Sequence, residues 1–472
     1  MQVLEPNACY PALVARDARF DGHFYVGVTS TGIYCRPICR VRTPKLANCR
    51  FFASAAQAEA AAFRPCLKCR PELAPRSAFT AMEASELLAH EAARLIEAGE
   101  DSMAAVADRL GITDRHLRRI FAAVHGVTPL QYLQTRRLLL AKQLLTDSAL
   151  SVAQVALAAG FASLRRFNAA FLEHYRLQPT ALRKQGRDGV PIKTDTPPAL
   201  RLAWRGPYDV GGLLRFLAAR AVQGVERVDI ENNRIERSVK IRHQDQLLRG
   251  AVSVDFGKDG VQVRLAAQLW PAVASLLPML RRWLDLDAEP QAIAAALPEG
   301  ATPGLRLPGT LDRFELAVRA VLGQQVTVAA ARTLAGRFVE RFGEPVEGGL
   351  IGFPEPETIA HAPVERIAEL GIIRQRAEAL RAIAAAWPRL AFAQGQLGTQ
   401  PQLDDALREL QDLPGIGPWT ARYMLMRGWS WPDAWLQGDV ALKKARGGVL
   451  GTGEEHRPYR SYAVLHYWRT LA

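Results

Sequence analysis

The sequence predicts a multidomain α+β protein. Its 472 residues exceed what a single hydrophobic core organises. Hydrophobic residues make up 49% of the chain and charged residues 23%, as in folded globular proteins. Strand-like and helical patterns follow each other in blocks. We therefore expect, in chain order, a small α+β module, an all-α segment, a strand-containing subdomain and an all-α core.

Changes in pattern along the chain give the expected boundaries. Alternating apolar residues at Ser238–Arg242 and Gly260–Leu265 indicate strands in the third part. Gly186, Gly189 and Pro191 stand in a segment typical of a linker. The predicted parts are 1–78, 79–186, a linker at 187–199, 200–298 and 299–472.

The charge of the chain predicts a polyanionic partner. The net charge is +13, and residues 1–190 carry 25 Lys and Arg against 16 Asp and Glu, whereas residues 191–472 carry 35 against 31. Such an excess suits nucleic acid, although it also suits solubility alone. Neither a signal peptide nor an 18-residue apolar run is present, so we expect a cytoplasmic protein without membrane contact.

Four of the six cysteines lie in the N-terminal part as two close pairs. The pairs are Cys35-x-x-x-Cys39 and Cys66-x-x-Cys69. Cytoplasmic thiols stay reduced, which favours metal binding over disulfides. Four thiolates at this spacing are typical of one tetrahedral Zn²⁺ ion. An inert structural zinc site remains an alternative at this point.

Basic residues surround these cysteines. They predict a surface that contacts DNA phosphates, since phosphate contacts come mainly from Arg and Lys. The candidates are Arg36, Arg40, Arg64 and Lys68.

Residues 20–72, with these cysteines and their basic neighbours, resemble the metal-binding domain of Ada, which repairs methylphosphotriesters in DNA. The resemblance implies that Cys35 accepts the methyl group and that Cys39, Cys66 and Cys69 complete the zinc site. Methylation would remove one negative charge from the site, and we expect DNA binding to tighten as a result.

Residues 80–185 predict two helix-turn-helix units. Helices at 103–110 and 114–124 flank one short Gly-containing turn, and helices at 152–159 and 163–175 flank another. Asp114 and Ser163 are the expected helix caps. The predicted groove-facing residues are Arg115, Arg118, Arg119, Arg165, Arg166 and Asn168. The tandem arrangement is similar to an AraC-type DNA-binding domain, which implies promoter DNA and RNA polymerase as partners.

Near the C-terminus, Leu413–Gly417 predicts a tight turn between two helices. Gly415 and Gly417 would let backbone N–H groups approach a DNA phosphate closely. Asp439 follows about twenty residues later as a candidate catalytic carboxylate. Asp433 is its rival, although its position beside Pro432 is typical of a turn residue.

These motifs, within residues 200–472, resemble AlkA-type glycosylases of the helix-hairpin-helix superfamily. The resemblance implies excision of N-alkylated bases such as 3-methyladenine from flipped nucleotides. It assigns Trp419, Tyr423 and Trp468 to the base pocket and charge stabilisation to Asp439. Trp419 holds the place of the lysine of bifunctional lyases, so a monofunctional enzyme that leaves an abasic site is expected.

Two features depart from the usual pattern of that family. The residue that fills the gap in the duplex would be Gln324 or Gln325, both polar. The stretch from Asp439 to Arg460 is several residues shorter than usual and rich in glycine, so a loop is expected to replace a helix there.

Together the parts predict a DNA alkylation repair protein that also regulates transcription. It would excise alkylated bases, and it would accept a methyl group on a zinc-bound cysteine that enhances DNA binding and transcription activation. The alternative is a transcription regulator alone, with an inactive glycosylase-like half. A zinc-stapled DNA-binding protein without methyl transfer is the third interpretation.

Overall fold

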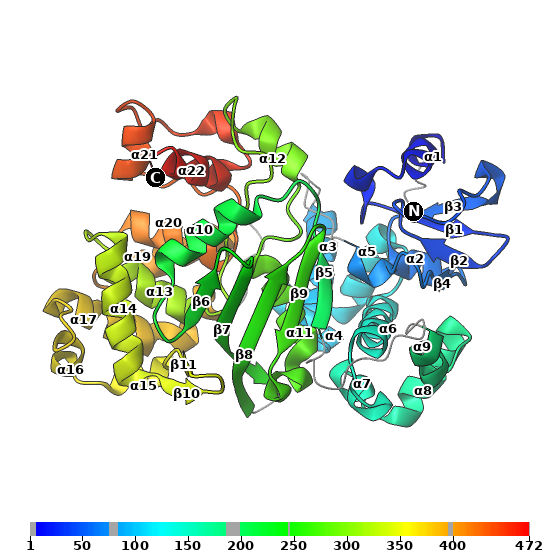
Figure 1. The fold of residues 1–472 in the computed structure, drawn as a ribbon, viewed down its shortest axis with the longest axis horizontal. Helices are drawn as coiled ribbons and strands as arrows, with labels where there is room; N and C mark the ends of the chain where they lie inside the picture. The colour runs from blue at the N-terminus through cyan, green and yellow to red at the C-terminus, as the bar shows by residue number, and fades with distance from the viewer. Residues whose placement is uncertain (1–5, 75–83, 186–198, 244–245, 395–399, 472) are drawn as a thin grey trace. The chain divides into compact units, whose positions relative to one another are not determined.

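The computed structural model describes residues 6–74, 84–185, 199–243, 246–394 and 400–471 (Figure 1). The chain divides into two compact units. Unit 1 is Met1–Gly206 with Asp259–Arg264 and Trp270–Pro278, and unit 2 is Pro207–Lys258 with Leu265–Leu269 and Met279–Ala472. Apart from Ala199, the predicted linker lies outside the described residues.

The N-terminal module of unit 1 is a four-stranded sheet with short helices, as predicted. The strand order is β3-β1-β2-β4, with β1 antiparallel to β2 and β3, and β2 parallel to β4. Tyr34, Phe52 and Phe63 are buried between the sheet and α2. The elements are α1 (Pro6–Ala15), β1 (Tyr25–Val28), β2 (Ile33–Cys35), β3 (Cys49–Phe52), α2 (Ala55–Ala60) and β4 (Arg64–Pro65).

The next part of unit 1 is helical and holds both predicted helix-turn-helix units. Its helices are α3 (Ala84–Ala98), α4 (Met103–Arg109), α5 (Asp114–His125), α6 (Pro129–Asp147), α7 (Val152–Ala158), α8 (Leu164–Tyr175) and α9 (Pro179–Gln185). Ser163 caps α8 as predicted, because its side chain accepts a hydrogen bond from Arg166 N. The predicted cap of α5 is wrong: Thr113 caps it, accepting from His116 N, and Asp114 begins the helix.

Strands follow, as the alternating pattern predicted. β5 (Ala199–Ala203) pairs antiparallel with β9 (Gly260–Leu265). In unit 2, β7 (Arg234–His243) pairs antiparallel with β6 (Glu226–Asp229) and with β8 (Gln246–Phe256). Helix α10 (Val210–Arg220) precedes β6 and ends in Arg220.

The rest of unit 2 is mainly helical around one large apolar core. Phe314, Phe338, Leu380 and Leu425 are among its buried residues. The helix α11 (Val273–Trp283) begins in a segment of unit 1 and ends in unit 2. The other helices are α12 (Pro290–Ala296), α13 (Arg313–Leu322), α14 (Val328–Phe342), α15 (Pro356–His361), α16 (Val364–Ala368), α17 (Arg374–Ala386), α18 (Ala391–Gln394), α19 (Gln400–Gln411), α20 (Pro418–Gly428), α21 (Val440–Ala445) and α22 (Arg460–Arg469). A two-stranded hairpin, β10 (Glu344–Val346) with β11 (Leu350–Gly352), interrupts the helices.

No helix in the described ranges is both long enough and apolar enough to cross a membrane.

Candidate functional sites and family

The four paired cysteines converge on one point in unit 1. One sulfur from each of Cys35, Cys39, Cys66 and Cys69 lies within 4.8 Å of the other three. The parallel pairing of β2 with β4 brings the two pairs together, because Cys35 ends β2 and Cys66 directly follows β4. Four sulfurs at this separation match a tetrahedral zinc site, and a bound Zn²⁺ would supply the charge that keeps them as thiolates.

Arg36 does not belong to the predicted phosphate-binding surface. Its side chain is buried, and its guanidinium forms a forked ion pair with Asp21. It also donates to the carbonyl of Cys69 at 3.1 Å, while its backbone N–H donates to Cys69 Sγ at 3.4 Å. Arg36 therefore stabilises the cysteine site through its hydrogen bonds to Cys69. Spacing could not reveal this role, since Asp21 belongs to a separate turn.

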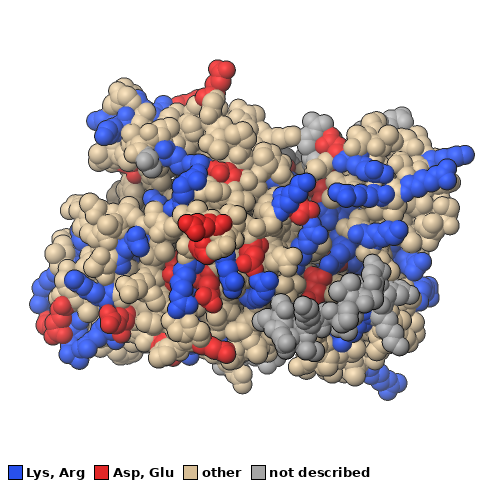
Figure 2. Space-filling view, viewed as in Figure 1, with Lys and Arg blue, Asp and Glu red and all other residues tan. Residues whose placement is uncertain are grey.

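The other basic candidates of the module reach solvent. Arg40 and Lys68 are exposed and Arg64 is half-buried. Lys and Arg side chains gather over the part of the view that holds β1 to β4 (Figure 2). This surface can bind phosphates beside the cysteines.

Both predicted recognition helices present basic residues to solvent. Arg115, Arg118 and Arg119 are exposed on α5, and Arg118 pairs with Asp114 at 2.6 Å. On α8, Arg165 and Arg166 are exposed and Asn168 is half-buried. Such helices suit contacts to DNA backbone and base edges.

The predicted helix-hairpin-helix is present in unit 2 as α19, a tight turn and α20. Gly415 has φ +77, a left-handed conformation that favours glycine, and an added Cβ would lie 3.0 Å from Ala379. Gly417 precedes α20 without a side-chain cap, so the first N–H groups of that helix remain available to an anion.

Asp439 sits where side chains from two helices meet. It is 7% exposed and caps α21, with Oδ1 accepting from Leu442 N at 2.6 Å. Trp419 Nε1 donates to Oδ2 at 2.9 Å, and Trp468 Nε1 donates to Oδ1 at 3.2 Å. Three donors thus fix the carboxylate, which suits a group that must face a developing positive charge.

The three predicted pocket residues form one aromatic group around that carboxylate. Trp419 and Tyr423 stack with centroids 5.2 Å apart and ring planes 8° apart, and Trp468 lies 6.4 Å from Tyr423. Arg427 Nη1 donates to the Tyr423 hydroxyl at 3.0 Å. Sequence reasoning missed Arg427, because one arginine within an apolar helix has no distinctive pattern.

The two glutamines of the turn between α13 and α14 differ in their surroundings. Gln324 Nε2 donates to Gly415 O at 2.9 Å and to Thr420 Oγ1 at 3.1 Å, so it ties the turn to the hairpin. Gln325 is exposed and has φ +53. Of these two glutamines, Gln325 has the more exposed side chain.

The rival carboxylate has a structural role. Asp433 accepts two hydrogen bonds of 2.9 Å from Arg460 and also pairs with Arg457 at 3.4 Å. Between Asp439 and Arg460 the chain forms α21, an irregular stretch with four glycines at positive φ, and a short 3-10 helix at Glu454–His456. Trp435 Nε1 holds this stretch by donating to Gly451 O at 3.1 Å.

Comparison with known proteins assigns a family to each part. Residues 8–72 match the metal binding domain of Ada, and residues 106–185 match a helix-turn-helix domain. Residues 199–312 match the AlkA N-terminal domain, and residues 318–444 match the HhH-GPD superfamily of base excision DNA repair proteins.

A probable bifunctional transcriptional activator/DNA repair enzyme AlkA from Mycobacterium tuberculosis is 37% identical over 98% of this chain and 96% of its own. The chain belongs to this family of bifunctional activator and repair proteins. DNA-3-methyladenine glycosylase 2 of Escherichia coli is 38% identical over 57% of this chain and 96% of its own. The bifunctional transcriptional activator/DNA repair enzyme Ada of Escherichia coli is 36% identical over 27% of this chain and 35% of its own.

Membership of this family confirms the predicted fold class, zinc cofactor and combined function. The protein is a zinc-binding DNA glycosylase and transcriptional activator, and its partner is DNA.

Proposed function

We propose that Asp439 is the carboxylate that drives base excision, within a pocket formed by Trp419, Tyr423 and Trp468. The observation that carries this proposal is the convergence of both indole N–H groups on Asp439. An N-alkylated base bears positive charge and stacks well on electron-rich rings. As the bond from C1′ to the base nitrogen breaks, the base takes the electron pair and the sugar becomes cationic. Asp439 stabilises that charge while water adds to C1′ and releases a proton.

Trp419 supports a monofunctional reaction, because an indole cannot form a Schiff base. The expected products are a free base and an intact strand that carries an abasic site. A direct test incubates duplex DNA containing 3-methyladenine with the protein and analyses both base and strand. Cleavage of the DNA strand without added alkali would contradict the proposed reaction.

We propose Gln325 as the residue that fills the gap left by the flipped nucleotide. Its exposed side chain and positive φ support this role, whereas Gln324 is committed to the hairpin. The hairpin around Gly415 and Gly417 would hold a phosphate of the same strand through backbone N–H groups.

In the N-terminal module, we propose that the Cys35 thiolate attacks the methyl carbon of a DNA methylphosphotriester. An S–C bond forms, the C–O bond breaks, and the phosphate oxygen leaves with the electron pair. Cys39, Cys66 and Cys69 complete the zinc site. Arg40, Arg64 and Lys68 would hold the neighbouring phosphates. A mass gain of one methyl group on the Cys35 peptide, absent in Cys35→Ala and retained in Cys9→Ala, tests this step.

Methylation turns a thiolate into a neutral thioether, so repulsion of DNA phosphates falls. We propose that DNA binding by α5 and α8 then tightens, through Arg115, Arg118, Arg119, Arg165, Arg166 and Asn168. RNA polymerase is the proposed protein partner and the cytoplasm the proposed place of action, since the relatives are named as transcriptional activators of bacteria. The boundaries 1–78, 79–186, 200–298 and 299–472 also remain proposals.

A further inference from the structure

Two arginines from distant parts of unit 2 act on the same tyrosine. Arg427, one turn after Tyr423 in α20, donates Nη1 to the Tyr423 hydroxyl at 3.0 Å. Arg220, the last residue of α10, interacts electrostatically with Tyr423, and its guanidinium lies over the Phe216 ring that Arg427 also faces. The positive charge at the end of α10, in the strand-containing subdomain, therefore acts on the base pocket.

Other contacts fix Arg427 in place. Its Nε donates to Pro308 O at 2.8 Å, and its Nη2 donates to Gly309 O at 3.1 Å. Its guanidinium also lies 5.0 Å from the ring centroid of Phe216 on α10. Arg427 is 6% exposed and, among the residues that the structure describes, has no carboxylate partner.

Arg220 is held just as firmly. Its guanidinium lies 3.8 Å above the Phe216 ring, and its backbone carbonyl accepts a hydrogen bond of 2.5 Å from Arg319 Nη2. Within the described ranges Arg220 also lacks a carboxylate partner. Arg427 is buried and Arg220 is half-buried, and a cation without a counter-ion is costly in such surroundings. Carbonyl oxygens and the phenol oxygen of Tyr423 offset part of that cost.

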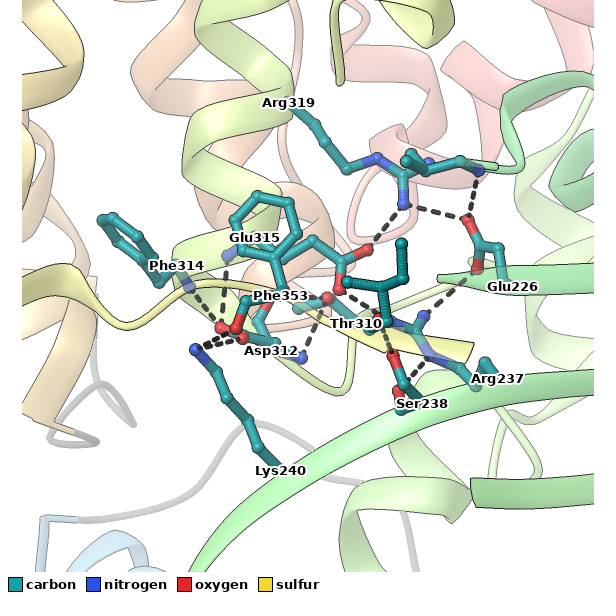
Figure 3. A network of polar contacts seen from close by, with 12 residues as sticks. Glu226, Arg237, Ser238, Lys240, Thr310, Asp312, Phe314, Glu315, Arg319 and Phe353 are labelled. Atoms are coloured by element: carbon teal, nitrogen blue, oxygen red, sulfur yellow. Dashed lines mark hydrogen bonds and ion pairs between the residues drawn. The ribbon is translucent and has the colours of Figure 1, made fainter. Parts of the chain in front are cut away.

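Arg319 belongs to a buried ionic network with Glu226, Arg237 and Glu315 (Figure 3). Its bond to the carbonyl of Arg220 ties that residue to the network. Arg319 pairs with Glu226 at 3.0 Å and with Glu315 at 2.7 Å, and Arg237 pairs with the same two carboxylates at 3.3 and 2.6 Å. Two arginines and two glutamates balance each other there. The network thus fixes the end of α10 against α13 and leaves the charges of Arg220 and Arg427 uncompensated.

The electrostatics of Tyr423 agree with this geometry. Burial alone would raise the pKa of the phenol, but the positive charges of Arg427, Arg220 and Arg319 outweigh burial and lower it. The oxygen is therefore an acceptor of hydrogen bonds from guanidinium groups. Its ring stacks on that of Trp419.

We propose that Arg220 and Arg427 form a clamp on the Tyr423 hydroxyl that sets the orientation of the stack between Tyr423 and Trp419. Trp419 in turn donates to Asp439, so the clamp acts on the carboxylate through two intervening side chains. Both arginines are positioning residues. The inference rests on the proposed function of this pocket. It gives Arg220, a residue of the strand-containing subdomain, a role in positioning the pocket side chains.

A double-mutant cycle between Tyr423→Phe and Arg220→Met tests the clamp. The readout is single-turnover release of 3-methyladenine, with maximal rate and half-saturating enzyme concentration measured separately. We expect each single variant to lower the maximal rate about ten-fold or more, as misplacement of a reacting group does. Half-saturation should change little, because both groups are proposed to act on the carboxylate rather than on the DNA backbone. The double variant should be no slower than Tyr423→Phe, and Arg220→Lys should restore part of the rate.

Arg313→Met is the matched control. Arg313 is also an arginine of this core, and it lies 3.7 Å above the Trp429 ring and donates to the carbonyls of Gly428 and Ala393 at 3.3 Å. Loss of this arginine should lower stability, and any effect on rate should multiply with that of Tyr423→Phe. If the rate effects of Arg220→Met and Tyr423→Phe also multiplied in the double variant, the two residues would act independently and the clamp would be overturned.

A second readout does not depend on excision. Because the chain has 10 tyrosines, the ultraviolet titration of Tyr423 is obtained as the difference between wild type and Tyr423→Phe. Arg220→Met or Arg427→Met should move that titration to higher pH, and an unchanged titration would refute the clamp. If wild type releases no base, the proposed function fails. The titration alone then tests whether the two arginines act on the Tyr423 hydroxyl. Release by wild type without coupling refutes only the clamp.

Discussion

Trp419 and Asp439, twenty residues apart in the sequence, are joined by a hydrogen bond of 2.9 Å from the indole Nε1 to Oδ2. This bond links the first turn of α20 to the residue that caps α21. It couples an aromatic wall of the pocket to the carboxylate, so that Trp419 both stacks on Tyr423 and orients Asp439.

Trp419→Phe should separate these two roles. The ring that can stack remains, while the donor to Asp439 is lost. A hydrogen bond to a charged group contributes about 1.5–3 kcal/mol, which corresponds to about a ten- to hundred-fold fall in the excision rate. Single-turnover release of 3-methyladenine measures it. A rate equal to wild type would show that the indole N–H does not position Asp439.

The two glutamines between α13 and α14 should respond differently to alanine. Gln325→Ala removes an exposed side chain and should weaken binding to duplex DNA that contains an abasic-site analogue, with little loss of stability. Gln324→Ala removes two hydrogen bonds to the hairpin and should lower stability by about 1–3 kcal/mol. Fluorescence anisotropy and urea unfolding measure these effects. The opposite pattern would assign the insertion role to Gln324.

Removal of zinc should affect the two activities unequally. All four clustered cysteines lie in unit 1, whereas Asp439 and its donors lie in unit 2. Metal binding contributes folding free energy to small modules of this kind. Chelation, or Cys66→Ala, should abolish methyl uptake and lower the melting temperature of the N-terminal module, with base release retained. Loss of both activities on chelation would contradict this expectation.

A buried ion pair should support the junction of η3 (Pro71–Leu73) with α6. Lys142 and Glu72 have side chains only 1% and 2% exposed and lie 2.6 Å apart, and Arg70, next to Cys69, shares Glu72 at 2.9 Å. Lys142→Met leaves the carboxylate short of a partner and should cost about 3–5 kcal/mol. Urea unfolding of the zinc-loaded protein measures the loss. The double variant Lys142→Met with Glu72→Leu should regain much of the lost free energy of unfolding. A double variant no more stable than Lys142→Met would contradict the pairing.

His125 should make the stability of the helix-turn-helix segment depend on pH. Burial lowers its pKa from 6.5 to about 4, and the hydrogen bond to Ala89 O offsets part of that effect. The folded state thus favours neutral imidazole. Stability from this group is present above pH 6.5 and is lost as pH falls through about 4. Thermal unfolding across this range should show a flatter profile for His125→Gln, and parallel profiles would exclude His125 as the cause.

Local patterns in the sequence were sufficient for the metal site and the hairpin. The cysteine spacing and the Leu-Pro-Gly-Ile-Gly motif each describe one short segment, and the structure has Cys35 beside Cys66 and α20 beginning just after Gly417. The strands at Ser238–Arg242 and Gly260–Leu265 also follow from simple alternation, within β7 and as β9.

Long-range contacts were beyond such patterns. Arg36 is of a residue type that commonly binds DNA phosphates, yet its charge is neutralised by Asp21, which belongs to a separate turn. Arg220 ends an ordinary helix, and only folding brings it to Tyr423 on α20. The cap of α5 at Thr113 rather than Asp114 differs by one residue, the usual error where both residue types can accept the hydrogen bond.

The measurement that tests the central claim most directly is single-turnover release of 3-methyladenine from alkylated duplex DNA by wild type and by Asp439→Asn. The amide keeps the shape of the side chain but removes its negative charge. We predict release by wild type and a fall of about a hundred-fold or more in the variant, the scale at which one preorganised charge contributes to such a transition state. Equal rates for the two proteins, or no release by folded, zinc-loaded wild type, would contradict the account.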